Sequence, residues 1–170
     1  MAWIIPPRGQ VVDYQHAMLM PGFVDIHVHG WGRGSFAWKG ERHSLQAMSR
    51  DLVNAGVTAW LATSATQPEA FLLESLSTAA DWITQAKAED GAEAVGIHME
   101  GPFINAKYSG MQRKEAIQPP SIKGFERYQQ AARGAYSLND SGARIAGCAA
   151  ADPSFAPGWR HGIRVMTPTY

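Results

Sequence analysis

The sequence has a single cysteine, no long apolar run and no excess of charge of either sign. Cys148 has no partner for a disulfide within the chain, which favours a reducing compartment. No stretch approaches the roughly 20 apolar residues of a membrane-spanning helix, and residues 1–7 lack a signal-peptide pattern. Because 15 basic residues balance 15 acidic ones, no net field draws the protein to nucleic acid or an anionic membrane. We expect a cytoplasmic protein that binds neither.

Several catalytic motifs are also missing. The sequence has no Gly-rich phosphate loop after a strand, no Gly-x-Ser-x-Gly elbow and no Cys/His nucleophile pair. Any anionic substrate must therefore be bound by local groups.

What the sequence does have is an alternation of short apolar runs with amphipathic segments. The apolar runs predict strands at 23–28, 57–62, 94–99 and, more weakly, 143–149. Helical spacing predicts helices at 44–55, with Ser44 as N-cap, at 68–90 and at 122–136. Such alternation implies right-handed crossovers and a parallel α/β sheet, either open or closed into a barrel.

The first candidate site is the run Asp25–Gly30 (DIHVHG) at the end of a predicted strand. Because strand side chains alternate, we expect His27 and His29 on the same face. Neutral imidazole is a common zinc ligand, and ligands gather at the carboxyl ends of parallel strands. The glycines at 30, 32 and 34 would let backbone come close to such a site. The alternative is a histidine pair hydrogen-bonded in a polar seam.

A second pair of polar residues, His98 and Glu100, ends the predicted strand 94–99. With His27 and His29, the Glu100 carboxylate would supply nitrogen and oxygen ligands from two strands, a mixture expected for zinc or iron rather than magnesium. His98 taken alone is more often a buried histidine that orients its neighbours. The other histidines lack such context and are expected at the surface: His16, His43 and His161.

A long loop, 105–114, follows Glu100 and so could overhang the site. Its Lys107, Arg113 and Lys114 could meet a phosphate. Basic residues in loops are, however, usually solvated charges.

These residues resemble a known family. Met20–Gly30 (MPGFVDIHVHG) resembles the first strand of the amidohydrolase superfamily, and Gly96–Ile104 (GIHMEGPFI), followed by Gly110–Gln112, resembles the signature of N-acetylglucosamine-6-phosphate deacetylases. Gly56–Ser64 matches their second barrel strand, and the similarity covers about 11–136. The resemblance implies a partial (β/α)8 TIM-type barrel of the first four or so βα units over 21–170, with 143–170 departing from the pattern. It also implies a remnant of a small amino-terminal β-sandwich domain at 1–20.

The resemblance further implies metal-dependent hydrolysis of N-acetylglucosamine-6-phosphate to glucosamine-6-phosphate and acetate. Glu100 would be the principal ligand of a divalent metal, zinc first with iron as an alternative, and His27 with His29 would complete a second position. Met111 and Gln112 fall where the family contacts the amino sugar phosphate, although many members have His in place of Gln112. A homodimer is the state considered for the full-length member.

Some of the family's residues are not recognisable here, namely two later metal-ligating histidines and a catalytic aspartate. We expect that aspartate to lie beyond this chain, and we expect the chain to be truncated or frame-shifted near residue 143. Two alternatives stay open. One is another amidohydrolase, such as a dihydroorotase-like cyclic amidase, and the other is a non-catalytic remnant that only binds metal or a partner chain.

Overall fold

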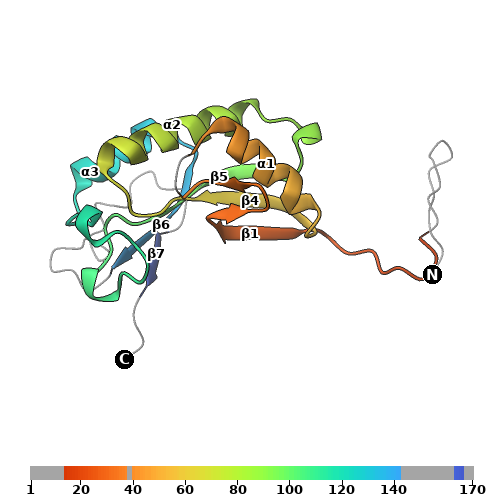
Figure 1. The fold of residues 1–170 in the computed structure, drawn as a ribbon, viewed down its shortest axis with the longest axis horizontal. Helices are drawn as coiled ribbons and strands as arrows, with labels where there is room; N and C mark the ends of the chain where they lie inside the picture. Colours follow the sequence, from red (N-terminus) through yellow and green to blue (C-terminus); the bar gives the residue numbers. More distant parts are fainter. Residues whose placement is uncertain (1–13, 38–39, 143–162, 167–170) are drawn as a thin grey trace.

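The main element of the fold is a parallel sheet of five strands in the order β1-β4-β5-β6-β7 (Figure 1). The computed structural model of the chain describes residues 14–37, 40–142 and 163–166. The strands are β1 (Phe23–Val28), β4 (Val57–Thr63), β5 (Glu93–Glu100), β6 (Tyr136–Gly142) and β7 (Ile163–Met166). A short antiparallel hairpin, β2 (Gly30–Trp31) and β3 (Gly34–Ser35), follows β1. The predicted α/β class with a parallel sheet is confirmed.

Within the described residues, three α-helices accompany the strands: α1 (Arg42–Val53), α2 (Glu69–Gln85) and α3 (Ile122–Ala131). Single 3-10 turns are η1 (Ala88–Asp90), η2 (Ala106–Tyr108) and η3 (Lys114–Ala116). Figure 1 shows the three helices along the same side of the sheet. Right-handed crossovers between strands in sequential order place their helices on one face, whereas a doubly wound sheet reverses its order. None of the helices in the described part of the chain is long and apolar enough to cross a membrane.

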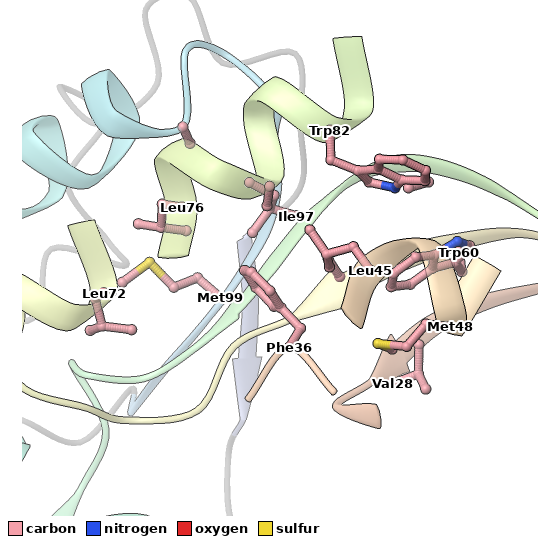
Figure 2. Close-up of a cluster of buried hydrophobic side chains, with 14 of the residues drawn as sticks. Val28, Phe36, Leu45, Met48, Trp60, Leu72, Leu76, Trp82, Ile97 and Met99 are labelled. Carbon is pink, nitrogen blue, oxygen red and sulfur yellow. The ribbon is translucent and has the colours of Figure 1, made fainter. Parts of the chain in front are cut away.

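The core lies between these helices and the sheet (Figure 2). Leu76 and Leu45 are fully buried and pack with Ile97 and Trp60 of the strands. The indole Nε1 of Trp60 donates to the Ser49 hydroxyl and to a backbone carbonyl, each at 3.2 Å, so the ring is buried without an unpaired donor. Full burial of each such aliphatic side chain contributes roughly 1.5–3 kcal/mol.

Most predicted elements are present close to their expected bounds. The strands predicted at 23–28, 57–62 and 94–99 correspond to β1, β4 and β5, and α2 begins directly after Pro68. Short apolar runs bounded by turn residues and a proline at a helix start are strong local signals, which explains the agreement.

Other predictions were wrong. Ser44 is not the N-cap of α1, which begins after Glu41, because the Ser44 hydroxyl bonds to Ser35 instead. The predicted helix 122–136 ends at Ala131, and strand β6 begins at Tyr136. The segment 143–149 lies outside the described residues, as do Cys148 and His161.

Candidate metal centre

Three donor side chains meet at the carboxyl end of the sheet. His27 comes from β1, His29 follows that strand, and Glu100 ends β5. The His29 Nε2 atom lies 2.8 Å from Glu100 Oε2, and His27 Nε2 lies 3.5 Å from the same oxygen. The two Nε2 atoms are 3.3 Å apart. All three side chains offer ligand atoms within 4.8 Å of one another, so the structure brings together the three residues singled out as metal ligands.

The hydrogen bonds of His29 define which ring nitrogen faces its neighbours. Its Nδ1 lies 3.2 Å from the carbonyl oxygen of Thr63, which can only accept, so Nδ1 carries the hydrogen of that bond. In a neutral ring, Nε2 then presents a lone pair toward the carboxylate of Glu100. Electron-rich atoms at these separations repel one another unless a cation or a shared proton lies among them. The cluster can therefore hold either a bound cation or a proton shared among its members.

The donor set fits a divalent metal. Ligand bonds of roughly 2.0–2.1 Å in tetrahedral zinc sites place ligand atoms about 3.3–3.4 Å apart. The separations in the cluster run from 2.8 to 3.5 Å and bracket that value. Catalytic zinc sites use three protein ligands of this kind and keep a further position for water or substrate. The imidazoles are 37% exposed and the carboxylate 21%, which leaves the site open to solvent.

His98 packs against this cluster without joining it. Its ring is fully buried, and its Nδ1 lies 2.7 Å from the carbonyl oxygen of Ile26. The ring meets that of His27 edge-on, with centroids 4.8 Å apart. These contacts suit the predicted orienting role, because they restrict the rotation of the His27 ring.

The hairpin β2–β3 closes over the backbone of His29. The His29 carbonyl accepts three hydrogen bonds, from the amides of Phe36 and Ala37 at 2.8 and 3.1 Å and from the Ser35 hydroxyl at 3.1 Å. Ser35 is bonded in turn to the Ser44 hydroxyl of α1 through its amide and its carbonyl. The helix thereby restrains the segment that carries His29.

A second tie joins the hairpin to α1. The Arg33 guanidinium donates to both carboxylate oxygens of Asp51, and the Arg33 amide donates to one of them. These hydrogen bonds lower the pKa of Asp51 to about 2. A Cβ at Gly32 would lie 2.3 Å from the Asp51 carboxylate, and one at Gly34 would lie 2.1 Å from the Ser44 carbonyl. Gly32 and Gly34 therefore allow close packing of the hairpin on α1. The expectation that the glycines at 30, 32 and 34 let backbone approach a site stays a prediction.

The loop after β5 holds the two residues predicted to contact substrate. Met111 is fully exposed, whereas the Gln112 side-chain oxygen accepts a 2.6 Å bond from the amide of Thr66. Its NH2 group therefore is the end that can donate to a ligand. Thr66 lies against Gly101, where an added Cβ would be 2.0 Å from the threonine hydroxyl. This contact ties Gln112 to the end of β5, next to Glu100. The basic residues of the loop are exposed: Lys107, Arg113 and Lys114.

Sequence reasoning missed Thr63 and Thr66, and it assigned no role to Asp25. The available signals were weak. Thr63 is a hydroxyl residue that ends a strand whose other residues, apart from Thr58, are apolar, and Asp25 stands two residues before the first histidine. Both positions are typical of side chains that bond to nearby backbone.

Comparison with known proteins reveals consistent likenesses. The model of the amidohydrolase family matches residues 18–155. The chain is 39% identical over 119 residues to the N-acetylglucosamine-6-phosphate deacetylase of Bacillus subtilis (strain 168), covering 69% of this chain and 30% of that protein. It is 39% identical over 108 residues to the Vibrio furnissii protein of the same name, covering 64% and 26%.

A solved structure is also similar. It is a mutant N-acetyl-D-glucosamine-6-phosphate deacetylase from Mycobacterium smegmatis in complex with N-acetyl-D-glucosamine-6-phosphate, with a TM-score of 0.66 and 26% sequence identity. The match covers 77% of this chain and 32% of that chain. The chain therefore spans less than a third of the length of each of these relatives.

Proposed function

The chain belongs to the amidohydrolase family, and from that premise we propose that it forms part of an N-acetylglucosamine-6-phosphate deacetylase. The observation that carries this proposal is the convergence of His27, His29 and Glu100 at the carboxyl ends of two strands. The relatives at 39% identity favour the deacetylase over the cyclic amidase considered from the sequence.

The same proposal places the sheet in a partial (β/α)8 barrel over residues 21–170, with residues 1–20 belonging to a small β-sandwich domain. The sequential strand order and the helices on one side of the sheet support a barrel over an open, doubly wound sheet. Val24 and Ile26 of the edge strand β1 are apolar yet 62% and 50% exposed. Such exposure is expected if further elements of the barrel pack against β1 in the whole protein.

The proposed reaction is hydrolysis of the N-acetyl amide. His27, His29 and Glu100 would hold a divalent ion, with zinc the best match to the donor set, which would supply Lewis acidity toward the acetyl carbonyl and make water a stronger nucleophile at neutral pH. Glu100 contributes the negative charge of the site, and the Thr63 carbonyl keeps His29 in the tautomer whose Nε2 can bind the ion. Exposure of both imidazoles leaves room for the substrate amide on the open side.

Substrate positioning is assigned to the loop after β5. Gln112 holds its amide oxygen on Thr66 and so offers N–H donors, which suit phosphate or sugar oxygens. Met111, fully exposed beside it, would be covered by the sugar. A cytoplasmic location and a homodimer of the full-length protein stay predictions.

Acetate release from N-acetylglucosamine-6-phosphate tests the proposal in two arms. In the first arm, residues 18–136 replace the aligned segment of the Bacillus subtilis enzyme, and Glu100→Gln in that chimera is the control. We expect acetate release that the substitution abolishes, and a folded, zinc-loaded chimera without activity contradicts the proposal. In the second arm the chain is assayed alone with zinc. Acetate release that depends on Glu100 supports catalysis by this chain. Absence of acetate release supports a non-catalytic remnant.

A further inference from the structure

Strand β1 carries an irregularity beside the metal ligands. Asp25 is paired with Trp60 of β4, and Val28 is paired with Ala62, so β1 advances three residues while β4 advances two. We interpret this extra residue as a β-bulge, a feature that bends a strand and re-aims its side chains. His27 lies within this bulge, and His29 follows it directly.

A bulge removes backbone groups from the ladder between strands, and those groups need other partners. Here the partners are side chains. The amide of His27 donates to Asp25 Oδ1 at 3.0 Å, and the carbonyl of Ile26 lies 2.7 Å from His98 Nδ1. The amide of Val28 donates to the Thr63 hydroxyl at 2.8 Å. The bulge is therefore held by bonds from three side chains.

Of these three residues, Thr63 makes the most hydrogen bonds around the two histidines. It is fully buried, and its hydroxyl accepts from Val28 while donating to the Leu61 carbonyl at 3.3 Å. Its own carbonyl accepts from the His29 ring. One residue therefore holds both the backbone between the two histidines and the ring of the second. Val28 is itself buried, so without the hydroxyl its amide would lose its partner away from water.

We propose that Thr63 is a positioning residue of the metal centre, whose hydroxyl holds the β1 bulge so that the Nε2 atoms of His27 and His29 converge on Glu100. This inference rests on the proposed metal centre. Removing the hydroxyl frees the Val28 amide, lets the bulge relax and moves both imidazoles away from Glu100. Metal affinity then falls although every ligand is still present.

The test is titration of the full chain with Co²⁺, followed through its visible absorption bands, together with urea unfolding of the metal-free protein. Thr63→Val keeps the shape of the side chain without the hydroxyl, and Thr63→Ser keeps the hydroxyl. Ser49→Ala is the matched control, because it removes a buried hydroxyl that bonds to Trp60 instead of to β1.

We expect Thr63→Val to weaken Co²⁺ binding by roughly 10–100-fold, the usual cost of removing a group that supports a ligand. Thr63→Ser should restore the affinity and the absorption bands, and Ser49→Ala should lower stability with affinity unchanged. If Thr63→Val does not fold, Thr63→Ala, which also removes the hydroxyl and adds no metal ligand, takes its place with the same expected loss. If Thr63→Val binds Co²⁺ as tightly as the parent chain, or if Ser49→Ala loses as much affinity as Thr63→Val, the role of Thr63 is overturned and the metal centre still stands. A parent chain that binds no Co²⁺ overturns the metal centre as well.

Discussion

Two glycines with nearly the same backbone conformation allow the crowding of the hairpin to be measured. Gly32 has φ +57° and Gly110 has φ +56°, both in the left-handed region that side chains avoid. An added Cβ at Gly32 would lie 2.3 Å from the Asp51 carboxylate and 2.7 Å from its Cβ. At Gly110 nothing lies within 4 Å. Alanine introduces the same backbone strain at either position, and only Gly32→Ala adds a steric conflict.

The magnitudes follow from these two contributions. Left-handed backbone costs an L-residue about 1–2 kcal/mol, which is the whole effect expected for Gly110→Ala. Overpacking of a close contact adds typically ~1–3 kcal/mol, so Gly32→Ala should cost about 2–5 kcal/mol in the free energy of unfolding. Displacing Asp51 also breaks its bonds to Arg33 and loosens the hairpin over His29. Urea unfolding of both variants at neutral pH measures the difference, and equal losses for the two would refute the reasoning.

Three further predictions can be checked directly. Leu76→Ala empties a fully buried core position and should lower the free energy of unfolding by about 2–5 kcal/mol, measured by urea unfolding. Because Arg33 holds the pKa of Asp51 at about 2, below its ordinary 3.8, the stability from that pair is present above pH 3.8 and is lost as pH falls toward 2. Unfolding measured from pH 5 to 2 should show a smaller acid loss in Arg33→Gln, and an unchanged slope would contradict this assignment. Glu100→Gln should weaken zinc binding by more than ~100-fold in calorimetric titration, since losing even a supporting group costs roughly 10–100-fold.

The strands and the identity of the donor cluster were accessible from the sequence for a physical reason. β1, β4 and β5 are short apolar runs flanked by turn residues, and such runs are typical of strands in a parallel sheet. Alternation along a strand brings His27 and His29 to one face, and parallel strands end at the same edge as Glu100. Both rules act within a strand or between neighbouring strands, so they can be applied to the sequence directly.

The features that the sequence does not reveal depend on contacts between distant residues. Ser44 has the composition of an N-cap, yet its hydroxyl bonds to the hairpin, and nothing local distinguishes the two roles. The bulge in β1 depends on Thr63 and His98, which lie 35 and 72 residues away from their partners. Contacts at such separations are set by the folded sheet and leave no periodic pattern along the chain.

The most direct test of the account is X-ray absorption spectroscopy of the zinc-loaded chain, compared with a His27→Asn, His29→Asn double variant. The proposed centre predicts nitrogen and oxygen neighbours at about 2.0–2.1 Å, with the outer-shell scattering of two imidazoles, and loss of that scattering in the double variant. A zinc spectrum without imidazole scattering, or one that the double variant leaves unchanged, would contradict a metal centre built from His27, His29 and Glu100.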